Sequence, residues 1–573
     1  MDRSDSASFC SVRRGRRPHG TPRNFMHENR ETSETPAGKS VGRSAGEGSG
    51  RTARMYVCEE SHSGVLPMNH SNKDTKTSAE SGEGRPLIKE NAGPPSTYPT
   101  QSGKGVSQGL AGVREAAREH KEMRFTALLH HLTVDLLRGS FYSLKRKAAP
   151  GVDGVRWQEY EYGLEDRLVD LHGRVHRGAY RAQPSRRVYV QKEDGRQRPL
   201  GVAALEDKIV QQAVVTILNQ IYEEDFLGFS YGFRPGRSQH DALDALSYAL
   251  LKKKVNYILD ADIRGFFDNL DKSWMIQFME HRVADPRILR LIRKWLKAGV
   301  MEEGQWSEPQ TGTPQGSVIS PLLANVYLHY SFDLWANVWR QKWAQGEVVV
   351  IRYADDTIVG FQYQRDADRF LENLRERLAK FGLELHPDKT RRIEFGRFAE
   401  ENRKRRGEGK PETFDFLGFT HISGKNSLGR FMVRRTTIRK RLRGKLRRIK
   451  QQLRMRMRDP LPQTGRWLQS VVQGHFNYYA VPGNLASLGV FRDRVLALWW
   501  RTLRRRSQRH RLSWTRILTL ASRWLPQPST LHPFPDARFA AIHLRQEPDA
   551  LTSARPGPRR GSCAITLPTP INN

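Results

Sequence analysis

Two adjacent aspartates, Asp355 and Asp356, interrupt an apolar stretch with the sequence VVVIRYADDTIVGF at residues 348–361. Aspartate is common in turns because its carboxylate hydrogen-bonds the neighbouring backbone, so an exposed turn explains the pair without any function. A Tyr-x-Asp-Asp sequence is also too short to be specific. Two like charges at the tip of an apolar hairpin nevertheless repel each other. The pair therefore indicates chemistry only if a further carboxylate lies nearby.

A third carboxylate, Asp262, lies in the stretch NYILDADIRGFFDNLD at residues 256–271. It stands at the end of the apolar run with which this stretch begins. The same stretch offers three alternatives, Asp260, Asp268 and Asp271. If this strand end lies beside the hairpin tip, two or three carboxylates converge and repel unless a cation neutralises them. Oxygen ligands without His or Cys favour a hard cation, Mg²⁺ first. Two such ions can activate a 3′-hydroxyl and stabilise a leaving pyrophosphate.

The residues around these carboxylates predict the elements that carry them. β-Branched residues on both sides of the aspartate pair favour a hairpin, and residues 255–263 favour a strand. Polar and apolar residues alternate on both sides of a turn within residues 186–202, which predicts a basic β-hairpin. Helices are expected over most of residues 203–255 and, from apolar spacing, over residues 365–385. This mixed order predicts an α+β domain with a largely antiparallel sheet.

The composition indicates a nucleic-acid partner. The 573 residues carry 96 lysines and arginines against 61 aspartates and glutamates, a formal net charge of +35. Such a surplus attracts polyphosphates, with a membrane surface as the competing partner. No apolar run approaches the roughly 18–20 residues of a spanning helix, and no signal peptide is visible. We therefore expect no membrane association and a cytoplasmic location.

The cysteines exclude one class of metal site. Only three cysteines are present, and they are far apart in the sequence. A disulfide framework or a cysteine zinc site is therefore not expected, and a reducing compartment fits best.

A strongly basic segment runs from Arg434 to Arg458, with thirteen lysines and arginines and no acidic residue. Apolar residues recur within it at spacings of three and four, which predicts one face of a helix; they are Ile438, Leu442, Leu446, Ile449 and Leu453. A solvated face is the ordinary interpretation of a charge run. A long run of one sign repels itself, however, so we favour a face that binds an anionic partner.

Eight sequence blocks resemble, in the same order, those of the reverse transcriptases encoded by group II introns, the intron maturases. They are APGVDGV, RPLGVAALEDKIVQQAV, FSYGFRPGRS, DADIRGFFDNLD, GTPQGSVISPLLANVYLH, RYADDTIV, LELHPDKTR and FDFLGF. The resemblance covers about residues 110–540 and implies a right-hand polymerase fold. Four parts are expected: a disordered basic tail at 1–105, a reverse transcriptase domain of fingers and palm at 106–420, an α-helical thumb or maturase domain at 421–525, and a short tail at 526–573.

The resemblance implies metal roles for four residues. Asp262 and Asp355 are implied as the principal ligands of two Mg²⁺ ions, with Asp356 as the second member of the doublet. The backbone carbonyl of Ile263 is implied as a further ligand. We also consider Lys389, in the block LELHPDKTR, a candidate to protonate the leaving pyrophosphate.

The resemblance also implies contacts to the incoming dNTP. Lys192 and Arg198 on the basic hairpin are implied to meet the triphosphate, with Arg186 as a weaker candidate, because fixed cations and the bidentate arginine fork hold phosphate oxygens. Phe267 is implied to pack under the sugar and to disfavour a ribose 2′-hydroxyl, with core packing as its alternative. Gln315 is implied to contact the nucleotide.

Two further blocks, GHFNYYAVPGN and LWWRTLRRRSQRHR, match the thumb of this family. Aromatic residues interleaved with arginine suit structured RNA, although the aromatic residues have core packing as an equal alternative. The predicted RNA-binding residues are Arg439, Arg443, Arg447, Tyr478, Tyr479, Arg504 and Arg505. The resemblance implies binding of the parent intron RNA, help with its splicing, and its copying into DNA at a target site in a bacterial cytoplasm.

Many relatives carry a C-terminal His-Asn-His endonuclease with zinc-binding cysteine pairs, and we expect none here, because residues beyond 525 hold only His532, His543 and Cys563 as zinc ligands. Priming is then expected from elsewhere, for example from a nascent strand at a replication fork. Two alternatives stay open. One is a splicing-only maturase with a vestigial polymerase site, and the other is a domesticated reverse transcriptase used in defence or repair.

Overall fold

The computed structural model describes residues 102–191, 197–302, 305–307, 312, 316–506, 512–535 and 538–539. The elements before residue 310 are α1 (Ser102–Glu119), η1 (Leu129–His131), α2 (Val134–Ser143), α3 (Trp157–Glu161), α4 (Leu164–His176), β1 (Ser185–Gln191), β2 (Gln197–Val202), α5 (Leu205–Asp225), α6 (Gln239–Lys252), β3 (Tyr257–Asp262), α7 (Lys272–Glu280), α8 (Pro286–Lys297), β4 (Val300–Glu302) and β5 (Gln305–Ser307).

The elements after residue 310 are α9 (Ser320–Leu328), the π-helical turn η2 (His329–Asp333), α10 (Leu334–Lys342), β6 (Val348–Tyr353), β7 (Asp356–Phe361), α11 (Gln364–Ala379), β8 (Arg391–Glu394), α12 (Ala399–Arg405), β9 (Phe414–Phe416), β10 (Phe419–Lys425), β11 (Phe431–Thr437), α13 (Arg439–Met455), η3 (Arg456–Arg458), α14 (Leu461–Tyr479), α15 (Leu485–Arg504) and α16 (Trp514–Trp524). None of these helices is both long enough and apolar enough to span a membrane.

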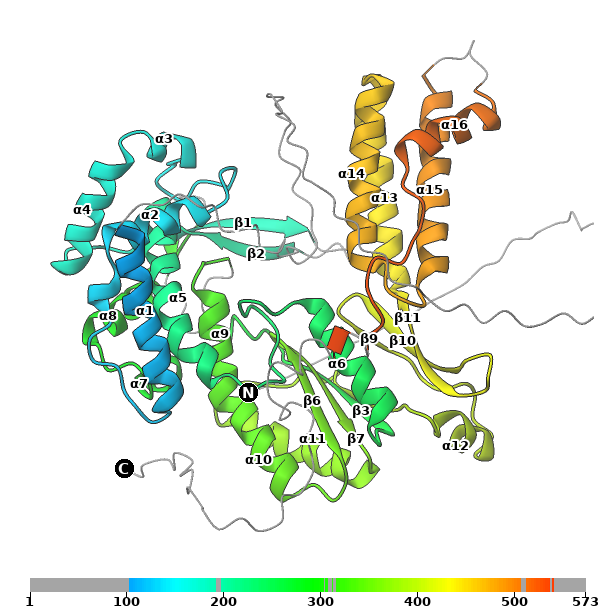
Figure 1. Cartoon of the computed structure of the whole chain (residues 1–573), viewed down its shortest axis with the longest axis horizontal. Helices are drawn as coiled ribbons and strands as arrows, with labels where there is room; N and C mark the ends of the chain where they lie inside the picture. Colours follow the sequence, from blue (N-terminus) through cyan, green and yellow to red (C-terminus); the bar gives the residue numbers. More distant parts are fainter. Residues whose placement is uncertain are drawn as a thin grey trace, which may run out of the picture. The chain divides into compact units, whose positions relative to one another are not determined.

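Four antiparallel strands in the order β6-β7-β3-β8 form the sheet that carries the predicted carboxylates (Figure 1), and we call it the aspartate sheet. The predicted hairpin at residues 348–361 and the predicted strand ending at Asp262 are both confirmed. The mixed α/β composition with antiparallel sheets is confirmed as well. Among the strand pairs given above, β1 and β4 are parallel, with Ser185 of β1 opposite Val300 of β4.

The aspartate sheet is buried on both faces, which explains the unbroken apolar runs on either side of its turn. Side chains of a strand alternate between faces. Ile258 and Ile358 therefore join the cluster that contains α6 residues, while Leu259 and Val359 join the larger cluster that contains α11 residues. Burial of both faces fixes the strand register, because a shift by one residue exchanges the faces.

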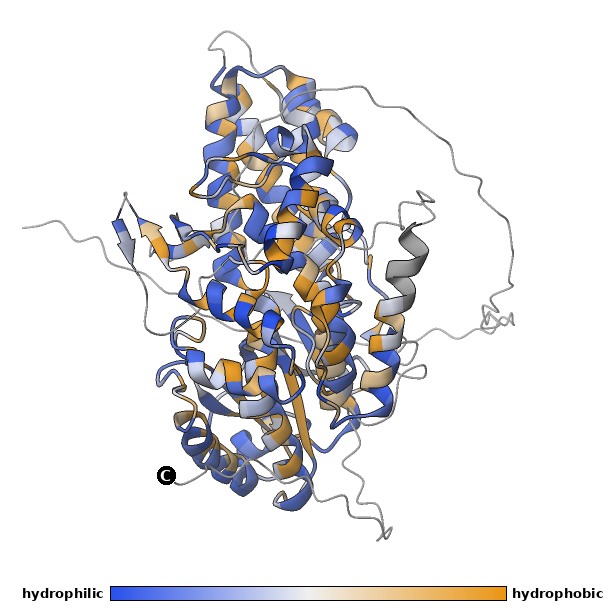
Figure 2. Ribbon diagram, turned by 90° about the vertical axis from the view of Figure 1, so that its left-hand side faces the viewer, coloured by the Kyte–Doolittle hydropathy of each residue, from blue (hydrophilic) through white to orange (hydrophobic). Residues whose placement is uncertain are grey.

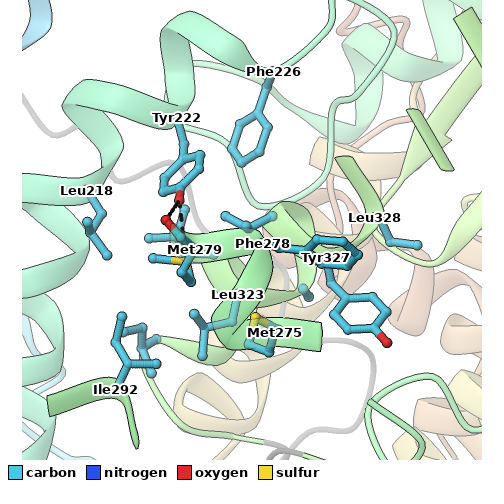
Figure 3. Packing of buried hydrophobic residues seen from close by; sticks show 14 of the residues in the cluster. Leu218, Tyr222, Phe226, Met275, Phe278, Met279, Ile292, Leu323, Tyr327 and Leu328 are labelled. Carbon is cyan, nitrogen blue, oxygen red and sulfur yellow. Dashed lines mark hydrogen bonds between the residues drawn. The ribbon is translucent and has the colours of Figure 1, made fainter. Parts of the chain in front are cut away.

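The larger cluster is the main core, and it connects the helices before the sheet with the sheet itself. Figure 3 shows part of it, where Phe278 of α7 packs near Tyr327 of α9, and the Tyr222 hydroxyl of α5 donates to the Met279 carbonyl at 3.3 Å. Figure 2 shows hydrophilic and hydrophobic residues alternating along the helices, as expected for helices with one buried face.

The predicted basic hairpin is confirmed as the antiparallel pair β1 and β2. At its base the Arg186 guanidinium donates to the Pro150 carbonyl at 2.9 and 3.2 Å. This contact fixes the hairpin against the APGVDGV block. It also gives Arg186 a structural partner within the protein.

Asp207 of α5 fixes the chain just before this hairpin and is a buried carboxylate. It accepts hydrogen bonds from the Tyr180 hydroxyl and from the Gln183 backbone amide, the latter at 3.0 Å. Burial raises the pKa of Asp207 to about 6 from an ordinary 3.8, although both hydrogen bonds oppose the rise. The folded protein therefore binds a proton between these pH values that the unfolded chain has released.

This pKa shift predicts a pH-dependent stability. Because the native state holds the extra proton, the contribution of Asp207 to stability falls as pH rises from 4 to 6, by at most about 3 kcal/mol, and stays constant above. The measurement is the melting temperature of wild type and Asp207→Asn across this range. The difference between the two proteins should change between pH 4 and 6 in favour of the variant, and two parallel curves would contradict the prediction.

The C-terminal helices α13, α14, α15 and α16 form a separate core (Figure 1), whose buried members include Leu453, Val472, Phe491 and Trp499. The predicted amphipathic helix is confirmed as α13. Its Ile449 and Leu453 are buried, while most of its arginines and lysines are exposed. The apolar stripe of the basic segment is therefore used for packing, and the cations remain on the other face.

The chain after α16 packs back onto the protein as far as it is described. Leu531 and His532 donate their backbone amides to the Ala480 carbonyl at 2.9 and 3.2 Å. Phe539 stacks on Tyr248 of α6 with ring centroids 4.5 Å apart. Part of the segment predicted as a short tail therefore connects the C-terminal helices with the helix that covers the aspartate sheet.

Candidate functional site

The end of the aspartate sheet brings the predicted carboxylates together. The register of β3 and β7 sets Asp262 directly opposite Asp356, so their Cβ atoms lie about 4.5–5.5 Å apart on one face of the sheet. Asp355 lies at the tip between β6 and β7 and is half-buried. The tip is conformationally unusual, because Ala354 has φ of 56° without being glycine. The ends of two strands and one turn therefore bring these three residues to the same edge of the sheet.

Asp260 is a fourth carboxylate on the same face, two residues before Asp262 in β3. Burial raises the pKa of Asp260 to about 7, Arg391 opposes the rise, and the carboxylates of Asp356 and Asp262 add to it. The sequence named Asp260 only as an alternative to Asp262. The structure shows that both lie on one face of the sheet end, where neighbouring carboxylates raise the pKa of Asp260 and a bound cation would be stabilising.

Lys389 supplies a positive charge at this group. Its Nζ lies 2.6 Å from Oδ2 of Asp262, and the lysine is about half exposed. Among the described residues, no three His, Cys, Asp or Glu side chains are gathered closely enough to enclose a metal ion. The donor set is nevertheless all oxygen, and Asp262 accepts a cation. The residues therefore fit a hard divalent ion such as Mg²⁺.

The segment before Lys389 holds the end of β3. His386 donates its backbone amide to the Asp262 carbonyl at 2.7 Å. Ile263 bridges Leu385 through its backbone, and its side chain is buried. The predicted role of the Ile263 carbonyl as a metal ligand stays a prediction, but the residue does directly follow the carboxylate that it is predicted to assist.

Gly312 and Gly316 approach the segments that carry two of the predicted nucleotide contacts, Phe267 and Arg198. Phe267 is half-buried against Phe266, with ring centroids 5.2 Å apart. An added Cβ on Gly312 would lie 2.8 Å from the Phe267 carbonyl, and one on Gly316 would lie 2.7 Å from the Gly201 carbonyl in β2. The two glycines therefore contact the Phe267 loop and the strand that carries Arg198.

Two nucleotide-contact predictions, Lys192 and Gln315, lie outside the described residues. Gln315 falls between the two glycines in the sequence, and Lys192 follows β1. Arg198 lies in β2 opposite Val190 and is half-buried.

The predicted RNA-binding arginines lie on exposed surfaces. Arg439, Arg443 and Arg447 are all exposed on α13 and are spaced one helical turn apart. Arg504 at the end of α15 is exposed and lies over the Trp500 ring at 5.0 Å, and Arg505 is exposed beside it.

The two predicted RNA-binding tyrosines lie in the packing between β10 and α14. The Tyr478 hydroxyl donates to the Leu417 carbonyl at 2.6 Å, and its ring stacks near Phe419 at 5.8 Å. Tyr479 packs against both the cluster over α6 and the C-terminal core. Both tyrosines therefore have packing roles, the alternative that the sequence left open.

Sequence reasoning did not identify Arg352, which precedes the aspartate tip in β6. Its side chain is fully buried and forms an ion pair with the equally buried Asp333. An arginine inside an otherwise apolar strand was the available signal. Because its partners are at least nineteen residues away in the chain apart from the tip itself, the sequence could not show what it contacts.

Comparisons with known proteins agree with this arrangement. Residues 190–421 match the family model described as reverse transcriptase (RNA-dependent DNA polymerase). The chain is 34% identical over 281 residues to Protein YkfC of Escherichia coli strain K12, a match that covers 44% of this chain and 73% of that protein.

Two further relatives are named for introns. The group II intron-encoded protein LtrA of Lactococcus lactis subsp. cremoris is 34% identical over 222 residues, covering 38% of this chain and 37% of LtrA. Nuclear intron maturase 2, mitochondrial, of Arabidopsis thaliana is 24% identical over 235 residues, covering 34% of this chain and 30% of that protein. Each match spans well under half the length of these two relatives.

Proposed function

Because the chain belongs to the family of group II intron-encoded reverse transcriptases and maturases, we propose that it is an RNA-directed DNA polymerase that also binds group II intron RNA. The observation that carries the proposal is the arrangement of three aspartates at the end of the aspartate sheet. There Asp262 lies opposite Asp356, and Asp355 occupies the adjoining tip. Repulsion between these carboxylates opposes folding, and a bound cation would offset it. Their proximity therefore favours a metal-binding function.

In this proposal the fold divides as a right-hand polymerase does. The aspartate sheet with α6 and α11 is the palm. The helices before it and the basic hairpin are the fingers, and α13 to α16 are the thumb. The cationic face of α13 and the basic hairpin then hold the phosphates of the RNA template and DNA primer. Fixed cations on two elements suit a polyanion that passes between them.

The proposed chemistry is nucleotidyl transfer. The primer 3′-oxygen forms a bond to the α-phosphorus of a dNTP, and the bond from that phosphorus to pyrophosphate breaks. Asp262, Asp355, Asp356 and the Ile263 carbonyl would hold two Mg²⁺ ions. Bound there, the ions lower the pKa of the attacking hydroxyl and neutralise charge on the pyrophosphate.

The chain's own cations complete the proposed site. Arg198, with Lys192 and Gln315, orients the incoming nucleotide, and Phe267 lies under its sugar. Lys389 would give a proton to the departing pyrophosphate, a role supported by the 2.6 Å contact between its ammonium and Asp262.

The proposed RNA function rests on the exposed arginines of α13 and α15, with Tyr478 and Tyr479 as further proposed contacts. Intron RNA held there would be helped to fold and splice, and then copied at a DNA target in the bacterial cytoplasm. Priming comes from the target or from a nascent strand.

Primer extension tests the reaction class. A DNA primer on an RNA template with dNTPs and Mg²⁺ should be extended, and omission of Mg²⁺ should stop the reaction. Absence of product, together with tight binding of intron RNA, would contradict the polymerase proposal and leave a splicing maturase.

Nucleotide selection tests the role of Phe267. Phe267→Ala removes the proposed obstacle to a 2′-hydroxyl, so we expect the preference for dNTPs over rNTPs to fall by about tenfold or more. The measurement is the ratio of kcat/KM for dGTP and GTP. Phe398→Ala is the matched control, because Phe398 is 50% exposed in a different part of the chain. An unchanged ratio would leave Phe267 with core packing alone.

A further inference from the structure

Arg352 lies two residues before the turn that carries Asp355, and all five of its side-chain N–H groups have partners. Nε and one terminal nitrogen donate to the two carboxylate oxygens of Asp333 at 2.7 and 2.5 Å. The same terminal nitrogen donates to the Ser230 hydroxyl at 2.7 Å. The other donates to Asn325 Oδ1 at 3.1 Å and to the Ala354 carbonyl at 3.0 Å. A single buried side chain therefore connects the turn to two other segments.

The Arg352 guanidinium donates to the carbonyl of Ala354, the residue of the turn with the most unusual backbone conformation. Ala354 has φ of 56°, in the left-handed region that residues other than glycine rarely adopt. Such a conformation persists only when surrounding contacts hold it. The Arg352 guanidinium supplies one such contact, immediately before the carboxylate of Asp355.

The loop at residues 229–234 supplies the second contact. It runs along the open edge of β6, where Arg352 donates its backbone amide to the Phe229 carbonyl at 2.9 Å and accepts from the Tyr231 amide at 2.8 Å. Gly232 then lies so close to the turn that an added Cβ would be 2.2 Å from the Ala354 nitrogen. Only glycine fits there without moving the turn. Asn325 fixes this glycine by donating to its carbonyl at 2.7 Å.

The π-helical turn η2 explains how two side chains of one helix both contact Arg352. Asn325 in α9 and Asp333 at the end of η2 are eight residues apart in one continuous helix. In a regular α-helix each residue turns about 100° around the axis. Eight residues therefore make two full turns and about 80° more, so the two side chains would point about 80° apart. The π turn holds one extra residue, which reduces the separation to about 20°. Both side chains then face Arg352.

We propose that these contacts form a clamp that positions Asp355 for metal binding, with Arg352 and Gly232 as positioning residues and Asn325 and Asp333 as their supports. The proposal rests on the proposed polymerase function. The clamp touches neither substrate nor metal, and it acts by fixing the turn on which Asp355 lies. Mg²⁺ requires near-ideal ligand geometry, so a small displacement of the turn weakens the site.

The test compares wild type with Gly232→Ala and Asn325→Ala. Gly232→Ala pushes on the turn without changing any charge, and Asn325→Ala removes a support while keeping a good helix former in α9. Gly139→Ala is the control, because an added Cβ there meets no atom within 4 Å. For each protein we would measure kcat, the KM for dNTP, the Mg²⁺ concentration at half-maximal rate, and the melting temperature.

We expect both variants to lose about 10–100-fold in kcat, as loss of supporting contacts around metal ligands usually does. The Mg²⁺ half-saturation should rise, while the KM for dNTP stays within twofold. A merely structural role would lower the melting temperature and leave the Mg²⁺ half-saturation unchanged, and that result overturns the proposal. If Gly232→Ala fails to fold, Asn325→Ala decides by the same readouts.

Mn²⁺ binding, measured by electron paramagnetic resonance, separates this proposal from the proposed function. If wild type makes no DNA but binds Mn²⁺ more tightly than both variants, the polymerase proposal fails and the clamp stands. Equal Mn²⁺ affinity in wild type and in a folded variant overturns the clamp.

Discussion

Asp262→Asn is expected to lower the rate of DNA synthesis by about 10³-fold or more and to leave RNA binding unchanged. Metal ions contribute several kcal/mol to such reactions, and each 1.36 kcal/mol is a factor of ten in rate. The substitution keeps the shape of the side chain and removes its charge. It also removes the ion pair that Asp262 makes with Lys389, so the local electrostatics change in the direction that disfavours a cation.

The measurement is the single-turnover rate of primer extension, with RNA affinity measured in parallel. Asp166→Asn is the matched control, since Asp166 is an exposed carboxylate of α4. The control should extend primers at the wild-type rate. A variant that loses RNA affinity together with activity would indicate a folding defect, and a variant within tenfold of wild type would remove Asp262 from the proposed metal site.

Reversing three charges on α13 is expected to weaken RNA binding by at least about tenfold and to flatten its salt dependence. Arg439, Arg443 and Arg447 lie one turn apart and are exposed, so one RNA backbone can contact all three. Each lost phosphate contact lowers the magnitude of the slope of log K against log salt by about 0.7 for single strands. The triple Glu variant should therefore lose about 2 from that slope.

A reversal of equal size elsewhere is the control for net charge. Arg365, Arg375 and Lys380, on or just after α11, are exposed on a helix that covers the aspartate sheet. Their change to Glu alters the total charge equally and should affect RNA affinity far less. Equal losses in the two triple variants would mean that overall charge, not the α13 face, attracts the RNA.

The elements that the sequence predicted well are those with a local cause. The hairpin at residues 348–361 follows from β-branched runs around a turn, and α13 follows from apolar spacing of three and four. The convergence of Asp262 with Asp356 was also expected, because both end or begin apolar strands. Strand register then set the two side chains opposite each other.

What the sequence missed depends on contacts between distant parts of the chain. Arg352 meets Ser230, 122 residues earlier, and Asp244 meets Arg538, 294 residues later. No periodicity encodes such pairs. The tyrosines of the GHFNYYAVPGN block show the same limit, because a sequence of aromatics and cations fits RNA stacking and core packing equally. Only the fold places Tyr478 against Leu417 and Phe419.

The most direct test of the central claim is one assay, the addition of the first nucleotide to a DNA primer on an RNA template. Wild type and an Asp355→Asn, Asp356→Asn double variant would be compared at saturating dNTP and Mg²⁺, with RNA affinity confirmed for both. We predict extension by wild type alone. Equal extension by both proteins, or extension by neither while both bind RNA, would contradict the assignment of the aspartate tip as the catalytic site.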